Sequence, residues 1–260
     1  MKIKENSFRL VGKDYQNDLS LSIRKKRDFR DTPIISIVVL MLIVFGCLAA
    51  ELIMTHNPTY MDLNHYSTPP SREFYFGTDS MGRDIFSMIW YGGRISLYIG
   101  FLATIISTTI AVIYGTISGT ATTWIDNSLM RINDLLLSLP NILVILFTQA
   151  LIGKQTPSAI ALVIGMTSWM SIAKVVRTEV RQLRNCEYVI ASKTMGGGFF
   201  HILRKHLAPN FFAAILFMVI MNIAGAIVAE STLSFLGMGL PTTVVSWGSM
   251  LSLAQNALLT

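Results

Sequence analysis

Long apolar runs, separated by shorter polar segments, dominate the sequence. Five runs approach or exceed the length of a membrane span: residues 34–54, 95–118, 135–152, 158–173 and 211–229. A helix of about 20 apolar residues crosses the roughly 30 Å of bilayer hydrocarbon. Helices are expected because lipid offers the backbone no hydrogen-bond partner, and the alternating pattern of a membrane barrel is absent. The pattern therefore predicts an all-α fold, a polytopic membrane bundle with about five complete transmembrane helices.

The polar segments divide the chain into regions. Residues 1–32 form an N-terminal tail, and residues 33–260 form the transmembrane domain. Within that domain we expect an outer loop over residues 55–94, a polar turn around Asp126, and a loop on the other face over residues 174–209. Pro33 suits the first turn of a helix, where its missing N–H is no loss. Pro140 lies inside the third run and predicts a bend there.

Composition and charge support the membrane assignment and fix an orientation. Hydrophobic residues make up 52% of the chain and charged residues 14%, which is not typical of a soluble domain. The net charge of +6 does not indicate nucleic acid, because the basic residues cluster at the ends of apolar runs. Of 21 Lys and Arg residues, 17 fall in residues 1–32, at Arg131 and in the 174–209 loop. The positive-inside rule therefore predicts a cytoplasmic N-terminus and a cytoplasmic 174–209 loop.

The 174–209 loop is basic and compatible with helix. Residues 178–193 lack Gly and Pro and are rich in helix formers, so most of this stretch is expected to be helical. Gly196, Gly197 and Gly198 predict a break before a second amphipathic stretch at 199–207. Pro209 is expected in the first turn of the fifth span. From the residues alone, two interpretations are equally open: a docking surface for a protein, or an interfacial helix that anchors the loop.

Outside this loop, a few polar residues are candidates for local structure. Asp79, Arg83 and Asp84 predict a short ion-paired turn, in which Gly77 and Gly82 supply the backbone freedom. The histidines and the two cysteines show no regular metal-ligand spacing, so no metal site is expected. Asn222 and Gln149 are candidates for lining the pathway or for hydrogen bonds between helices, and we favour the second. Glu230, at the outer end of the fifth span, is a functional candidate by its charge, but we favour a capping or packing role there.

Three motifs resemble one protein family. Glu187-Tyr188-Val189, Ala191-Ser192, Gly196 and then His206-Leu207-Ala208-Pro209 resemble the "EAA" loop of permease subunits of ATP-binding-cassette importers. The segment from Phe76 to Leu97 and the segment from Glu230 to Gly239 resemble the oligopeptide, dipeptide and nickel permeases. One departure is that Ile190 stands where the family pattern has a glutamate, which makes a charge contact there unexpected.

The resemblance implies a structure and a function. It implies six transmembrane helices, of which the sixth is not complete within these 260 residues, and a cytoplasmic coupling helix. It implies a permease for peptides, with nickel or metal-chelate uptake as one alternative and a truncated, non-transporting membrane protein as another. The ATPase-coupling residues would be Glu187, Tyr188, Ala191, Ser192, Gly196, His206 and Pro209. The outer-loop motif comprises Gly77, Thr78, Asp79, Gly82, Arg83 and Asp84.

The implied partners lie on both sides of a bacterial plasma membrane. They are a second homologous permease, two cytoplasmic ATPase subunits and an extracellular solute-binding protein, besides membrane lipid. The sequence contains no Gly-x-x-x-x-Gly-Lys-Ser/Thr phosphate loop, so ATP and magnesium are expected on the ATPase subunits. No catalytic residue, bound cofactor or metal ligand is predicted for this chain, and it is expected not to be an enzyme.

Overall fold

The computed structural model describes residues 34–241 and 243–259. The chain divides into two compact units, Met1–Val44 and Phe45–Thr260. The predictions for the tail at 1–32 and for Pro33 lie outside the described residues. In the first unit, the described part is the beginning of helix α2 (Ile34–Leu48), which is apolar but shorter than a full span. The fold and the candidate sites described below concern the second unit.

The described residues confirm an all-α fold. The helices after α2 are α3 (Ala50–Ile53), η2 (Leu63–His65), α4 (Ile85–Thr120), α5 (Thr123–Leu137), α6 (Asn141–Ile152), α7 (Pro157–Thr167), α8 (Met170–Leu183), α9 (Glu187–Thr194), α10 (Phe199–Ile202), η3 (Leu203–Leu207), α11 (Ala208–Phe235) and α12 (Trp247–Leu259). Extended pairing in this part of the chain is limited to an isolated antiparallel bridge between Thr78 and Asp84.

Two continuous helices are long and apolar enough to cross a membrane. They are α4, with 36 residues, and the stretch Phe199–Phe235, with 37 residues, which joins α10, η3 and α11. The pairs α5 with α6 and α7 with α8 also pass by length and composition, but they are bent by 88° and 48°. The described residues therefore contain two such spans, or up to four if each bent pair counts as one. Pro140 lies at the 88° bend, as the sequence predicts, because proline cannot continue the preceding helix.

Three expected boundaries are wrong. The outer loop is shorter than 55–94, because α4 already begins at Ile85, where the Asp84 side chain accepts a hydrogen bond from the Ser87 N–H. The polar turn around Asp126 is instead the first part of α5, whose polar residues Asp126 and Asn133 face the protein interior. The fourth run is not one helix, because it breaks between α7 and α8.

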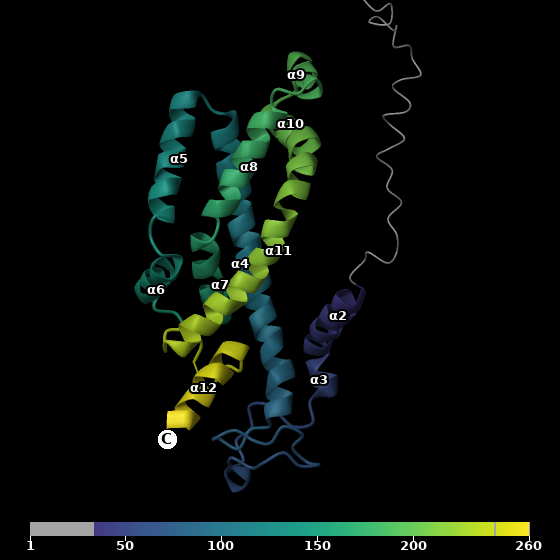
Figure 1. Ribbon diagram of the computed structural model, residues 1–260, viewed down its shortest axis with the longest axis vertical. Coiled ribbons are helices and arrows are strands. Elements are labelled where there is room, and N and C mark those ends of the chain that lie inside the picture. Colours follow the sequence, from purple (N-terminus) through teal and green to yellow (C-terminus); the bar gives the residue numbers. More distant parts are fainter. Residues whose placement is uncertain (1–33, 242, 260) are drawn as a thin grey trace, which may run out of the picture. The chain divides into compact units, whose positions relative to one another are not determined.

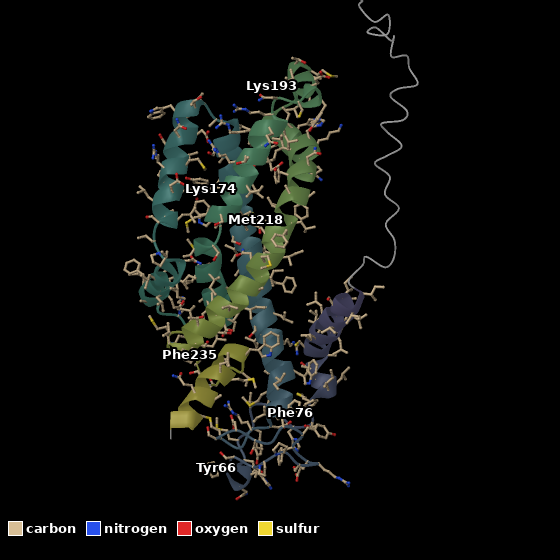
Figure 2. All side chains as sticks on the ribbon, viewed as in Figure 1. Tyr66, Phe76, Lys174, Lys193, Met218 and Phe235 are labelled. Carbon is tan, nitrogen blue, oxygen red and sulfur yellow. The ribbon has the colours of Figure 1, made fainter. Side chains whose placement is uncertain are left out.

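Helix α4 is the central element of the second unit. It contacts α7, α8, α11 and α12 along its length (Figure 1). Two buried apolar clusters hold the bundle together: one includes Ile99 and Ile160, and the other includes Val176 and Phe211. Figure 2 shows Lys193 of α9 at one end of this unit, Tyr66 and Phe76 at the other end, and Met218 of α11 between them. The 55–84 segment and the α9–α10 region therefore lie at opposite ends of α4.

Candidate coupling loop and transport cleft

The 174–209 loop folds as two helical pieces before the glycines. The prediction that most of residues 178–193 is helical is confirmed, although a turn separates α8, which ends at Leu183, from α9, which starts at Glu187. Val180 of α8 and Val189 of α9 both belong to the same buried apolar cluster. The turn between the helices redirects the chain so that each helix buries an apolar side chain. Helix propensity alone did not reveal this turn, because tertiary packing decides it.

The glycine break and the start of α11 follow the prediction. Gly196 has a φ of 86°, a left-handed conformation that favours glycine, and the Gly197 N–H donates to the Ser192 carbonyl. The chain then resumes as α10 at Phe199 and continues through η3, a π-helical stretch that contains His206. Pro209 lies in the first turn of α11, where its missing N–H is tolerated.

Most of the predicted coupling residues surround one open cavity. Its volume is about 650 Å³, and its lining is Tyr188, Ala191, Ser192, Met195, Gly196, Gly197, Gly198, His201, Lys205 and His206. Glu187 and Pro209 do not line it. Two apolar side chains in this region are highly exposed: Met195 at 87% and Phe200 at 80%. Ile190, at the position of the family's glutamate, is also exposed. The arrangement offers an apolar surface beside a recess with basic and histidine side chains.

A larger cleft lies at the bends of the two broken helices. It has a volume of about 760 Å³, and its lining comes from the α5–α6 corner, the α7–α8 corner and α11. Asn222 is among the lining residues and also donates a hydrogen bond to the Ser107 hydroxyl, 2.5 Å away on α4. The predicted interhelix bond of Asn222 is therefore confirmed. Gln149 differs from its prediction, because its amide donates to the Lys154 carbonyl just after its own helix.

The 55–84 segment contains the predicted turn. The Arg83 guanidinium pairs with Asp79 at 2.7 Å, and Gly77 and Gly82 have φ values of 75° and 74°. The Thr78 hydroxyl bonds within the segment, to Thr68 and to the His65 carbonyl. Asp84 differs from its expected role, because it begins α4 and accepts a hydrogen bond from the Ser87 N–H there.

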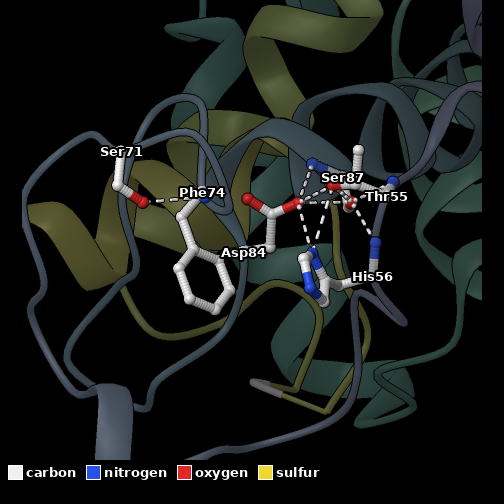
Figure 3. A network of polar contacts seen from close by, with 6 residues as sticks. All are labelled: Thr55, His56, Ser71, Phe74, Asp84 and Ser87. Atoms are coloured by element: carbon white, nitrogen blue, oxygen red, sulfur yellow. Dashed lines mark hydrogen bonds and ion pairs between the residues drawn. The ribbon is translucent and has the colours of Figure 1, made fainter.

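Asp84 is the centre of a buried polar network (Figure 3). One of its carboxylate oxygens accepts from the Ser87 hydroxyl at 2.5 Å and the Thr55 hydroxyl at 2.8 Å. His56 Nδ1 lies 3.8 Å from the same oxygen, and the His56 ring stacks on Phe74 with centroids 4.8 Å apart. The network joins the chain after α3 to the start of α4, so it holds the two ends of the 55–84 segment together.

A second pair in the same segment is solvent-exposed. His65 Nδ1 lies 2.7 Å from Asp62 Oδ2. The hydrogen bond to the Asp62 carboxylate raises the pKa of His65, and the same bond lowers the pKa of Asp62. The two groups therefore favour the charged pair, although exposure to water limits its contribution.

Glu230 is fully buried rather than being an interfacial cap. The hydroxyls of Ser234 and Ser246 both donate to its Oε1 at 2.9 Å, and Ser96 donates to Oε2 at 3.4 Å. These serines come from α4, α11 and the segment before α12. The run of hydroxyl residues after Glu230 was the available signal in the sequence, but which of them face the carboxyl depends on the fold.

From the sequence, Asp126 was predicted only to belong to a polar turn. In the structure, its carboxylate accepts more hydrogen bonds than the other carboxylate of α5, Asp134. It accepts from Arg177, Arg181 and Ser118. These partners are 8 to 55 residues away along the chain. No local spacing could have revealed them.

Comparisons with known proteins give matches over most of the chain. Residues 111–260 match the family described as the inner membrane component of binding-protein-dependent transport systems. The chain is 42% identical to the dipeptide transport system permease protein DppC of Bacillus subtilis over 195 residues, covering 75% of this chain and 61% of the relative. It is 36% identical to the oligopeptide transport system permease protein OppC of the same organism, covering 84% and 71%. A putative peptide permease of Brucella suis is 35% identical, covering 86% and 74%.

The helical bundle with apolar spans is typical of a multi-pass membrane protein, and the family match places it in the transport class. The chain belongs to the family of inner membrane components of binding-protein-dependent transport systems. It spans less than two thirds of the length of the dipeptide permease that it matches.

Proposed function

We propose that this chain is the membrane-spanning permease subunit of an ATP-driven importer for dipeptides or oligopeptides. The observation that carries the proposal is its identity of 42% and 36% to a dipeptide and an oligopeptide permease, over 75% and 84% of the chain. The relatives named above carry peptide names, which favours peptides over nickel or metal chelates. As a transport subunit, the chain binds no nucleotide itself, and the ATPase subunits supply the hydrolysis.

The cleft at the bends of α5–α6 and α7–α8 is the part of the chain best suited to the transport path. Its lining is mainly apolar but includes Asn141, Ser168, Ser171 and Asn222. Amide and hydroxyl groups can exchange hydrogen bonds with a peptide backbone, while Met218 and Met221 adapt to side chains of different shape. A second, homologous permease subunit would complete the wall of the path.

The α9–α10 region is the docking surface for an ATPase subunit in this proposal. The exposed Met195 and Phe200 leave apolar area that a partner groove can cover, which is typical of an interaction site. With Ile190 in place of a glutamate, apolar packing rather than an ion pair carries the contact. In this proposal, the 174–209 loop and the N-terminus lie in the cytoplasm, as the positive-inside rule predicts. The 55–84 segment then faces an extracellular solute-binding protein.

The proposal is tested in the assembled transporter, co-expressed with its ATPase and permease partners. Ala191→Arg, inside the recess, is expected to lower co-purification of the ATPase subunits and uptake of a labelled dipeptide by at least about tenfold, because a bulky cation replaces a small contact. Thr194→Arg is the matched control, since Thr194 is exposed on the same helix but does not line the recess. Unchanged assembly and uptake in Ala191→Arg would contradict the docking role. Uptake of labelled nickel but not of peptide would favour the alternative substrate.

A further inference from the structure

Three helices converge on the carboxylate of Asp126, which is only 3% exposed. Arg177 of α8 binds it with two nitrogens, Nε to Oδ1 at 2.7 Å and Nη2 to Oδ2 at 2.5 Å. Arg181 adds a bond to Oδ2 at 3.0 Å, and the Ser118 hydroxyl of α4 donates to Oδ1 at 2.6 Å. A two-pronged arginine–carboxylate contact fixes orientation as well as distance. The ends of α4 and α5 are therefore held against α8 in one defined geometry.

The arginines form a stripe along α8. Arg177, Arg181 and Arg184 are spaced by four and three residues, so they share one face of the helix. Arg184 donates to the Gly119 carbonyl at 2.8 Å. The whole stripe thus binds the corner between α4 and α5, which lies over residues 118–126.

The backbones of α4 and α8 also approach closely beside this stripe. Gly115 and Gly119 of α4 are four residues apart, the spacing that lets membrane helices pack tightly. A Cβ atom at Gly115 would lie 2.6 Å from the Ala173 carbonyl oxygen. A Cβ atom at Gly119 would lie 2.8 Å from Val180 Cγ1. We call this glycine contact, together with the arginine stripe on Asp126, the α4–α8 seam.

The connection from α8 to the preceding helix, α7, is a break rather than a continuous helix. α7 and α8 meet at a 48° bend around Ser168 and Trp169, where the helix is interrupted. By contrast, α4 continues without a break from the seam to Ile85, beside the 55–84 segment at the far end (Figure 1). A displacement of α8 is therefore expected to reach α4 through the seam, while α7, which also packs along α4, is joined to α8 only through the bend.

We propose that the α4–α8 seam makes α4 the element that carries movement of the coupling loop to the opposite end of the subunit, and that Asp126 is its positioning residue. This inference rests on the proposed transport function. α8 is joined to α9 by the short turn at residues 184–186, so movement of the docking surface is passed to the seam on one side, and to α11 through α10 on the other. The seam passes that motion on because both its glycine contact and its charged contacts resist sliding.

Asp126→Asn in the assembled transporter tests the proposal. ATPase subunits should still co-purify and ATP hydrolysis should stay within about twofold, because the docking surface is unchanged, whereas peptide uptake per ATP should fall about tenfold. Asp134→Asn is the matched control: it removes the exposed partner of Lys174, an ion pair at 2.6 Å between the same two helices. Uptake per ATP in the control should change by less than twofold.

Rescue separates positioning from general stability. Asp126→Glu, which keeps the carboxylate that Arg177 and Arg181 bind, should recover uptake per ATP relative to Asp126→Asn. If Asp126→Asn does not reach the membrane, Arg181→Gln, which removes one exposed arginine of the stripe, should show a smaller loss of the same kind. A parallel fall of ATP hydrolysis and uptake, or unchanged uptake per ATP, would overturn the proposal.

A readout without substrate distinguishes this inference from the proposed function. Nitroxide labels at Thr120→Cys and Gln182→Cys, in a background with both native cysteines replaced by serine, report the distance across the seam. The distribution should be narrow and unchanged between the nucleotide-free and ATP-bound complexes, and broader in Asp126→Asn. If the unmutated complex takes up no peptide, the proposed function fails, yet this distance still tests the seam. A distribution that changes with ATP in the unmutated complex contradicts the inference.

Discussion

The 55–84 segment and the α9–α10 region differ in how they accommodate their polar and apolar side chains. Both are polar connections at an end of α4, and both contain glycines at positive φ. The 55–84 segment bonds its own polar groups: Asp84 to Thr55 and Ser87, and Arg83 to Asp79. The α9–α10 region leaves Met195 and Phe200 87% and 80% exposed, which is more than Tyr60, at 67%, in the 55–84 segment.

The difference indicates which region is stable in the isolated subunit and which needs a partner. A connection whose polar groups are paired and that buries one ring, Phe74, gains stability within the subunit. An exposed apolar surface gains stability only when a partner removes it from water. The 55–84 segment is therefore expected to keep its structure in the isolated subunit, whereas changes on the α9–α10 surface should act on assembly rather than on folding.

The largest expected contrast is between two phenylalanines. Phe74 is 7% exposed and packs on His56 and His65. Its change to alanine should therefore lower the local stability by about 3 kcal/mol. Phe200→Ala should change stability by less than about 0.5 kcal/mol, because the side chain is already in solvent. Native-state hydrogen exchange of the amides that bond within the 55–84 segment, such as those of Gly77 and Asp79, measures the first effect. Equal protection of these amides from exchange in Phe74→Ala and Phe200→Ala would contradict the expected difference between the two regions.

A second pair compares glycines of similar conformation. Gly82 and Gly196 have φ values of 74° and 86°, so alanine at either site costs about 1–2 kcal/mol of backbone strain. A Cβ at Gly82 would also collide with the Asp62 backbone oxygen, whereas no described atom lies within 4 Å of one at Gly196. Gly82→Ala should therefore lower the thermal midpoint clearly more than Gly196→Ala does. Equal midpoints in detergent would show that the segment relaxes around the added methyl group.

The smallest effect is a pH dependence of the 55–84 segment. The His65 contribution is complete below the unfolded pKa of about 6.5 and is lost as pH rises through the raised folded pKa. The Asp62 contribution is complete above about 3.9 and is lost as pH falls through the lowered folded pKa. Protection from hydrogen exchange should therefore be greatest between about pH 4 and 6.5. His65→Asn should flatten this profile, and an unchanged profile in that variant would assign the dependence to other groups.

The sequence predicted part of the candidate site well. Gly196 as a break, Pro209 in a first turn and the turn at Gly77 and Gly82 follow from local backbone chemistry, which depends on the residue itself. The helix boundary at Leu183 was missed, because a turn there is favoured only by burying Val189 against residues from other helices. The functional roles of the loop residues, including Ala191 and His206, stay predictions.

The apolar runs by themselves determined the class of the protein, since a chain with several such runs has no other way to satisfy its backbone than as helices in lipid. They also determined the bend at Pro140, which is a local steric effect. Only the tertiary structure decided that Asp126 meets arginines some 50 residues later, that Glu230 is enclosed by three serines, and that a cleft opens at the two bends. These features arise from which helix faces pack together, and packing joins residues whose separation along the chain carries no periodic signal.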